Sequence, residues 1–231
     1  MHESIKITTL DGAFSAYVAT PAVRPAPAIV VLHELFGVNA DMRATCDELA
    51  DNGFIAVCPD LFWRQAPGLD LSHWTESEWK QGLALFDIYD LSEGVSDVVQ
   101  AISAARALAG ASGKVAVMGF CLGGLMTYLT AARNRVDAAV AYYGGGTENH
   151  LSEAMAVSGP MLMHLGEEDE FISKDAQRRI EEALAGNANV EIHRYPGCSH
   201  AFARHTGTRY DAAAAALANG RTVAFFDQHL R

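Results

Sequence analysis

The sequence has few cysteines, and their spacing suits neither a disulfide framework nor a metal site. The four are Cys46, Cys58, Cys121 and Cys198 in a chain of 231 residues, and no CxxC motif occurs. We therefore expect reduced thiols and a cytoplasmic protein. No apolar run approaches the roughly 18 residues of a membrane span, and the first residues do not resemble a secretory signal. The sequence therefore predicts no membrane partner.

Positive charge is also scarce. The chain has 17 basic and 28 acidic residues, which give a net charge of −11. A field of that sign disfavours nucleic acid and anionic membrane as partners, so an anionic ligand would need a local positive site. Half of the residues are hydrophobic, which excludes a disordered chain. No linker rich in proline, glycine or serine interrupts the sequence, so we expect a single domain over residues 1–231, acting as a monomer.

Strand and helix patterns alternate along the chain. Short apolar or alternating runs predict strands at 5–9, 13–19, 28–32, 54–57, 115–118, 136–142, 160–165 and 189–195. Longer periodic runs predict helices at 40–51, 92–109, 122–133, 174–185 and 209–229, and one that begins near Thr75 and includes Phe86. Asp11-Gly12 is typical of a hairpin turn. This alternation predicts an α/β architecture whose mostly parallel sheet is covered by helices on both faces.

The segment Gly119-Phe120-Cys121-Leu122-Gly123 has the pattern of a nucleophile elbow, with cysteine at the usual position of serine. It follows a predicted strand and opens a predicted helix. The helix dipole there favours a thiolate on Cys121, and the Leu122 N–H would face a developing oxyanion. The competing interpretation is a buried cysteine in a glycine-rich turn, because short motifs of this kind occur by chance.

Two further residues occur in the order that this architecture uses for a catalytic triad. Asp169 follows the strand predicted at 160–165, and His200 follows the strand at 189–195. Each could instead be an ordinary polar loop residue. The second oxyanion donor is expected after the strand at 28–32, where the Leu35 N–H is the candidate. Glu34 would then lie near the sulfur, which is electrostatically unfavourable for a thiolate.

Other classes of function have weaker signals. His33-Glu34 lacks the second histidine of a zinc motif, and Gly144-Gly145-Gly146 lacks the lysine and hydroxyl residue of a phosphate-binding loop. We therefore predict no metal and no cofactor. A redox-sensing thiol at Cys121 and a binding module without catalysis remain alternatives from other classes.

The sequence resembles the dienelactone hydrolase (carboxymethylenebutenolidase) family over nearly its whole length. The resemblance lies in collinear segments: His33-Glu34-Leu35-Phe36-Gly37-Val38-Asn39, Ala56-Val57-Cys58-Pro59-Asp60-Leu61, Arg64-Gln65-Ala66-Pro67-Gly68, Gly119-Phe120-Cys121-Leu122-Gly123-Gly124, Tyr142-Tyr143-Gly144 and Ser199-His200-Ala201-Phe202-Ala203-Arg204. It implies an α/β-hydrolase fold and a cofactor-free enzyme. Such an enzyme opens dienelactone (4-carboxymethylenebut-2-en-4-olide) to maleylacetate in the degradation of aromatic compounds.

The resemblance also assigns roles to individual residues. Cys121 would be the nucleophile, His200 the base and Asp169 its orienting acid. Glu34 matches a glutamate that interacts with the resting thiol, and Leu35 and Leu122 match the oxyanion donors. The residues assigned to substrate binding are Phe36, Trp79, Lys80, Tyr142 and Arg204. Tyr142 matches a tyrosine near the catalytic histidine, and Arg204 matches an arginine that binds the substrate carboxylate.

One departure from the family concerns the substrate. The position of a second carboxylate-binding arginine is Trp79 here, with Lys80 beside it. Lysine can supply the charge without the two-pronged geometry of arginine. An apolar wall at Trp79 would instead suit a less acidic or aromatic ester, which is the alternative substrate class.

Overall fold

The computed structural model describes residues 2–231. The chain divides into two compact units, Met1–Val117 and Met118–Arg231, and strand β5 contains the boundary. The single domain expected from the sequence stays a prediction. The strands are β1 (His2–Thr8), β2 (Ala13–Ala19), β3 (Ala26–Leu32), β4 (Ile55–Pro59), β5 (Ala111–Phe120), β6 (Ala138–Tyr142), β7 (Met161–Gly166) and β8 (Val190–Tyr195). The α-helices are α1 (Ala40–Asp51), α2 (Glu76–Asp87), α3 (Leu91–Ala107), α4 (Leu122–Arg133), α5 (Lys174–Leu184) and α6 (Ala212–Leu230).

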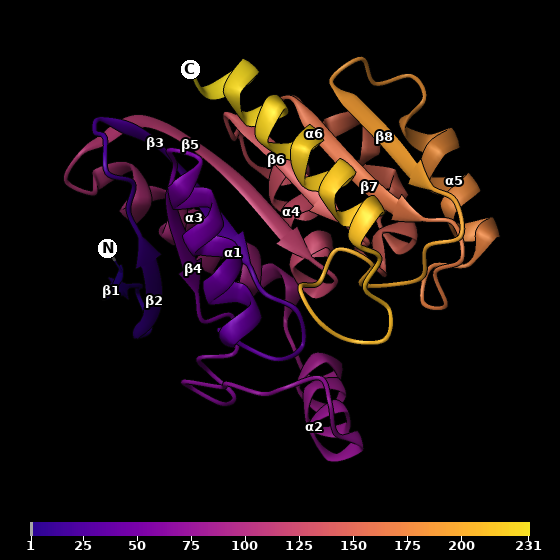
Figure 1. Cartoon of the computed structure of the whole chain (residues 1–231), viewed down its shortest axis with the longest axis horizontal. Coiled ribbons are helices and arrows are strands. Elements are labelled where there is room, and N and C mark those ends of the chain that lie inside the picture. Colours follow the sequence, from indigo (N-terminus) through magenta and orange to yellow (C-terminus); the bar gives the residue numbers. More distant parts are fainter. Residues whose placement is uncertain (1) are drawn as a thin grey trace. The chain divides into compact units, whose positions relative to one another are not determined.

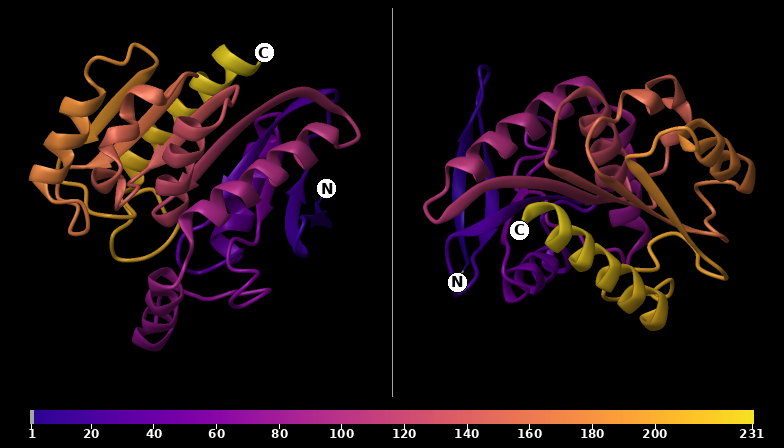
Figure 2. Two further views of the ribbon diagram at one scale, coloured as in Figure 1. Left: turned by 180° about the vertical axis from the view of Figure 1, so that it is seen from behind. Right: turned by 90° about the horizontal axis from the view of Figure 1, so that it is seen from above.

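The first unit contains strands in the order β1-β2-β4-β3. β1 and β2 form the hairpin predicted around Asp11-Gly12, with Thr8 opposite Ala13. β2 pairs antiparallel with β4, and β4 pairs parallel with β3. Every residue of β3 and β4 is buried, which explains their unbroken apolar runs. Helices α1 and α3 cover opposite faces of these strands (Figures 1 and 2).

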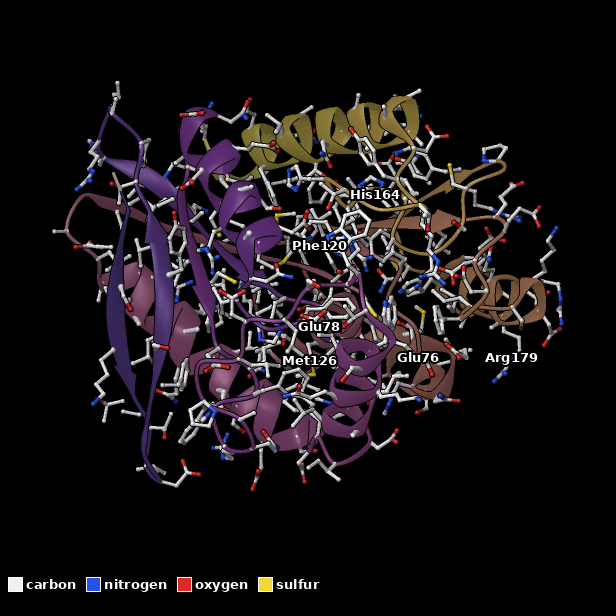
Figure 3. The ribbon with its side chains drawn as sticks, turned by 60° about the horizontal axis from the view of Figure 1, so that its bottom comes forward. Glu76, Glu78, Phe120, Met126, His164 and Arg179 are labelled. Atoms are coloured by element: carbon white, nitrogen blue, oxygen red, sulfur yellow. The ribbon has the colours of Figure 1, made fainter. Side chains whose placement is uncertain are left out.

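Side-chain caps fix where the helices of the first unit begin. Asn39 accepts a hydrogen bond from the Met42 N–H at the start of α1, and Asp90 accepts from the N–H groups of Ser92 and Glu93 at the start of α3. Thr75 and Glu78 form the predicted capping box of α2, with the Glu78 N–H donating to Thr75 Oγ1. Figure 3 labels Glu78 on the first turn of this helix.

The second unit is built on the parallel strands β6, β7 and β8, in that order. Figures 1 and 2 show α6 on one face of these strands, with α4 and α5 on the other. His164 of β7 is fully buried beneath α6 (Figure 3). Its Nε2 is bonded to Thr222 Oγ1 at 3.1 Å, and its Nδ1 to the Tyr195 hydroxyl at 2.8 Å. This buried polar network anchors α6 to the sheet.

The observed strands and helices differ from the predicted ones mainly at their ends. β5 begins at Ala111 rather than at 115, because its exposed first residues carry no apolar run. α6 begins at Ala212 rather than at 209, where Asp211 caps the N–H groups of Ala213 and Ala214. Two short 3₁₀ segments, Thr147–Asn149 and Leu151–Ala156, have no periodic signal and were not predicted.

Candidate active site

The nucleophile elbow predicted at Cys121 has the expected backbone geometry. Cys121 stands between β5 and α4 with φ 55° and ψ −114°, a conformation that residues other than glycine rarely adopt. Its N–H donates to the Tyr142 carbonyl at 3.1 Å, and its carbonyl accepts the Leu125 N–H at 3.0 Å. The side chain is partly exposed at the first turn of α4. The turn therefore presents the sulfur outward at the positive end of a helix.

Two glycines allow this turn to close. A Cβ added at Gly119 would lie 2.2 Å from the Gly123 carbonyl oxygen, and one at Gly124 would lie 2.4 Å from the Tyr142 carbonyl oxygen. Both neighbours are backbone atoms that cannot rotate away. The glycines are thus required for close approach of the chain segments around Cys121.

We expect Gly119→Ala to destabilise the protein by about 3 kcal/mol, because overpacking against backbone forces the elbow apart. Urea unfolding followed by circular dichroism measures this. Gly220→Ala is the control, since an added Cβ there has no atom within 4 Å and the site is inside α6. That variant should gain about 0.5–1 kcal/mol from helix propensity. Equal effects of the two substitutions would contradict the close-approach argument.

Asp169 and His200 meet as a buried pair. Asp169 Oδ2 lies 2.8 Å from His200 Nδ1, and the two side chains are 0% and 2% exposed. The other oxygen, Oδ1, accepts hydrogen bonds from the Phe171 and Ile172 N–H groups at 2.8 and 3.0 Å. Both carboxylate oxygens are therefore satisfied, which fixes the orientation of the carboxylate and of the imidazole ring.

The imidazole of His200 is enclosed by aromatic rings. The Tyr143 ring centroid lies 5.0 Å from that of His200, and the Phe171 centroid lies 4.8 Å from it. The backbone N–H of His200 donates to Glu170 Oε2 at 3.1 Å. Ring packing and backbone anchoring together leave the histidine little freedom to rotate.

Two neighbours, Cys121 and Asp169, determine the direction in which the pKa of His200 is shifted. Burial alone would lower the His200 pKa, but the charge of Cys121 and the hydrogen bond with Asp169 outweigh burial and raise the pKa to about 10. His200 Nε2 is buried and has no well-directed hydrogen bond within residues 2–231. Cys121 therefore acts on His200 mainly through its charge. The second unit thus brings Cys121, His200 and Asp169 together in the order of a triad.

Leu122 and Arg204 belong to the same unit. Leu122 is the first residue of α4 and is 1% exposed. An N–H group in the first turn of a helix has no partner in the helix itself, which suits it to an oxyanion. Arg204 is 5% exposed, and its backbone N–H donates to the Ala201 carbonyl at 3.1 Å.

The other predicted residues belong to the first unit. Glu34, Leu35 and Phe36 follow β3 and are 3%, 5% and 1% exposed. The Phe36 and Trp79 rings meet edge to face with centroids 4.9 Å apart, and Trp79 Nε1 donates to the His73 carbonyl at 2.9 Å. The apolar wall expected at Trp79 therefore includes Phe36.

Lys80 has a local partner. Its Nζ lies 2.7 Å from Glu76 Oε1, one helical turn earlier, and its side chain is 74% exposed. Exposed pairs of this kind contribute little energy, so Glu76 does not hold Lys80 rigidly. It does offset the positive charge that Lys80 would offer to a substrate.

Tyr142 does not lie where the sequence interpretation put it. Its side chain is fully buried, and its hydroxyl bonds Thr222 Oγ1 at 2.6 Å and Asn219 Oδ1 at 3.0 Å, both on α6. The ring packed on His200 belongs instead to Tyr143, whose φ is 37°. Successive side chains of a strand point to opposite faces, and two adjacent tyrosines gave no signal to choose between them. Tyr142 is thus part of the core under α6, and its assignment to substrate binding was wrong.

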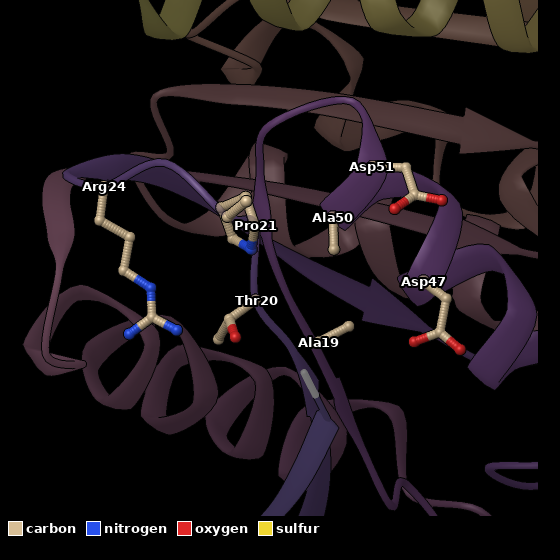
Figure 4. Close-up of a pocket in the computed structure, with 8 residues that line it drawn as sticks. Ala19, Thr20, Pro21, Arg24, Asp47, Ala50 and Asp51 are labelled. Atoms are coloured by element: carbon tan, nitrogen blue, oxygen red, sulfur yellow. The ribbon is translucent and has the colours of Figure 1, made fainter.

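A groove of about 560 Å³ is lined by residues of the first unit, among them Arg24, Asp47 and Asp51 (Figure 4). Its lining includes none of the predicted catalytic residues. Within residues 2–231, no group of three or more His, Cys, Asp or Glu residues is arranged to hold a metal ion. Over the same residues, no helix is both long and apolar enough to cross a membrane.

Comparison with known proteins gives a consistent family. Residues 14–230 match the model of the dienelactone hydrolase family. The chain is 43% identical to a carboxymethylenebutenolidase of Pseudomonas putida over 224 residues, covering 96% of this chain and 95% of that protein. It is 40% identical to carboxymethylenebutenolidase 1 of Cupriavidus pinatubonensis, with the same coverage.

A solved structure agrees with this comparison. The crystal structure of a candidate dienelactone hydrolase from Klebsiella pneumoniae superposes with a TM-score of 0.87 at 29% identity, covering 99% of this chain and 98% of that one. The predicted α/β-hydrolase fold with a mostly parallel sheet is thereby confirmed. The chain belongs to the dienelactone hydrolase family, and it is a hydrolase that acts on carboxylic ester bonds.

Proposed function

We propose that this protein is a cysteine-dependent hydrolase that opens the lactone ring of dienelactone to give maleylacetate. The observation that carries the proposal is the arrangement of His200, whose Nδ1 lies 2.8 Å from Asp169 Oδ2 and whose pKa is raised by the charge of Cys121 and by the bond to Asp169. The carboxymethylenebutenolidases among its relatives supply the substrate class.

The proposed reaction begins with attack of the Cys121 thiolate on the lactone carbonyl carbon. The resulting oxyanion accepts hydrogen bonds from the Leu35 and Leu122 N–H groups. When the tetrahedral intermediate collapses, the ring C–O bond breaks and the leaving enolate takes a proton from His200. Now neutral, His200 removes a proton from water, which attacks the thioester and releases the acid and the thiolate. Once Cys121 carries its negative charge, the pKa of His200 is about 10, so His200 is protonated at neutral pH when the thiolate attacks.

Glu34 has the role of controlling the thiol in this proposal. The resemblance to the family makes Glu34 a partner of the resting thiol that helps to generate the thiolate when substrate arrives. Glu34 follows β3 and is almost fully buried.

A substrate panel tests the proposed function directly. Purified protein would be assayed with both dienelactone isomers and with neutral aryl esters of similar size. We expect the highest kcat/KM for a dienelactone isomer. The edge-to-face pair of Trp79 and Phe36 favours the second candidate, an aromatic or less acidic ester, and a higher kcat/KM for the neutral esters would support it. No hydrolysis of any of them would overturn both.

We expect Arg204→Ala to raise KM for an anionic lactone about 10- to 100-fold, the range for losing a hydrogen bond to a charged group. KM for a neutral ester should change about twofold or less, because that substrate has no carboxylate to bind. Initial-rate kinetics with both substrates measure the two effects. Arg194→Ala is the control, since Arg194 is a more exposed arginine of β8 that pairs with Glu167 and Glu181. Equal changes for both substrates would remove the assigned role of Arg204.

A further inference from the structure

His33 is a buried histidine with both ring nitrogens bonded to backbone. It directly follows β3 and is 0% exposed. Its Nδ1 lies 2.6 Å from the Glu34 carbonyl oxygen, and the Leu61 N–H donates to its Nε2 at 2.9 Å. The side chain therefore joins the segment after β3 to the segment after β4.

These contacts determine which nitrogen carries the proton. A backbone N–H can only donate, so Nε2 of His33 must offer its lone pair to Leu61. The Glu34 carbonyl can only accept, so Nδ1 must hold the proton. Burial favours this neutral form, because it lowers the His33 pKa more than the Glu34 hydrogen bond and the Asp60 charge raise it. His33 is thus a fixed, uncharged bridge.

The bond to Glu34 acts on an adjacent backbone group. The Glu34 carbonyl and the Leu35 N–H belong to the same planar peptide unit, so holding one end fixes the direction of the other. In a trans peptide the N–H points away from the carbonyl, and hence away from His33. Donation to the carbonyl also polarises the peptide, which strengthens the N–H as a donor.

The same segment is confined beyond Leu35. A Cβ added at Gly82 of α2 would lie 2.8 Å from the Leu35 carbonyl oxygen, so the backbones of α2 and of this segment are in close contact. The Leu35 residue is therefore held at its two flanking peptide units, by His33 on one side and by α2 on the other.

We propose that His33 is a positioning residue for hydrolysis, which aims the Leu35 N–H at the oxyanion by holding the Glu34 carbonyl. The inference rests on the proposed function, in which Leu35 is an oxyanion donor. His33 touches neither the substrate nor the sulfur in this role. Misdirecting such a donor weakens only the transition state, so kcat should fall while KM is nearly unchanged.

The test compares His33→Leu with His33→Gln. Leucine loses both hydrogen bonds, and kcat should fall about 10- to 100-fold with KM within about twofold. The glutamine amide can donate to Glu34 and accept from Leu61, so it should restore kcat to within about fivefold of wild type. His33→Phe, which keeps a ring without nitrogens, replaces the leucine variant if that does not fold.

His164→Leu is the matched control, because His164 is equally buried and also uses both ring nitrogens, but beneath α6. It should lower stability in urea as His33→Leu does, with kcat within about threefold of wild type. Equal losses of kcat in the two leucine variants would reduce His33 to a structural residue. An active wild type with unchanged kcat in His33→Leu would overturn this inference alone, whereas an inactive wild type would overturn the proposed function as well.

A measurement on the unaltered protein completes the test. Nitrogen-15 NMR of the imidazole should show His33 as the neutral tautomer protonated at Nδ1 from acidic to neutral pH. A protonated Nε2 would contradict the bridge regardless of how the variants fold.

Discussion

Cys121→Ala should lower kcat for dienelactone hydrolysis about 10⁶-fold, the scale of removing the nucleophile from a catalytic triad. The reason is geometric as well as chemical. The elbow holds Cys121 at φ 55°, and no other described thiol of the second unit is presented at a helix start, since Cys198 is buried in a loop. With the sulfur gone, water would have to attack the lactone without covalent catalysis.

Stopped-flow and overnight assays with dienelactone and an activated aryl ester would measure this loss. Cys198→Ala is the control, because it removes a thiol only two residues from His200. Its kcat should stay within about twofold of wild type. If Cys121→Ala retains the hydrolysis rate while consumption of peroxide depends on Cys121, the thiol is a redox sensor rather than the nucleophile.

Asp169→Asn should lower kcat about 10⁴-fold by imposing the wrong tautomer on His200. In the wild type, Oδ1 of Asp169 accepts two backbone N–H groups, so an asparagine must keep its oxygen at that position. Its amide NH₂ then faces His200 Nδ1 and can only donate to it. The proton of neutral His200 is forced onto Nε2, which can no longer accept one from water.

The measurement is kcat for a dienelactone isomer, with Glu168→Gln as the control. Glu168 is the neighbouring acidic residue, but it is exposed and paired with Lys174 at 2.8 Å. Its substitution should change kcat less than about twofold, because exposed pairs of this kind contribute little. A comparable loss in both variants would mean that overall negative charge, and not the Asp169–His200 contact, supports the reaction.

The same substitution has a consequence for stability as pH changes. The His200 pKa is raised from 6.5 to about 10 in the folded protein, so the folded state binds the proton more tightly than the unfolded chain. The stabilisation is complete below about pH 6.5 and is lost as pH rises through 10. Asp169→Asn removes part of the cause, so the difference in unfolding free energy between wild type and variant should shrink over this window. Urea unfolding of both proteins at several pH values measures this. A difference in unfolding free energy that stays constant with pH would mean that the Asp169–His200 contact is not ionic.

Local chemistry made much of the fold predictable. The helix at 122–133 and the helix at 40–51 were predicted with their observed ends, because apolar periodicity and the residues that stop a helix are local features of the sequence. The capping box of Thr75 and Glu78 was predicted for the same reason. By contrast, the first residues of β5, from Ala111, carry no apolar run, so the local sequence does not mark where this strand begins.

For the candidate site, the sequence by itself determined the identity and order of Cys121, Asp169 and His200, because each follows the end of a predicted strand and the elbow glycines are local. Only the tertiary structure decided that Asp169 meets His200, that Tyr143 rather than Tyr142 packs on His200, and that the Leu61 N–H donates to His33. These facts depend on the direction of side chains and, at Tyr143, on a positive φ. Both are set by packing between segments that are distant in the chain, and no local pattern of residues records them.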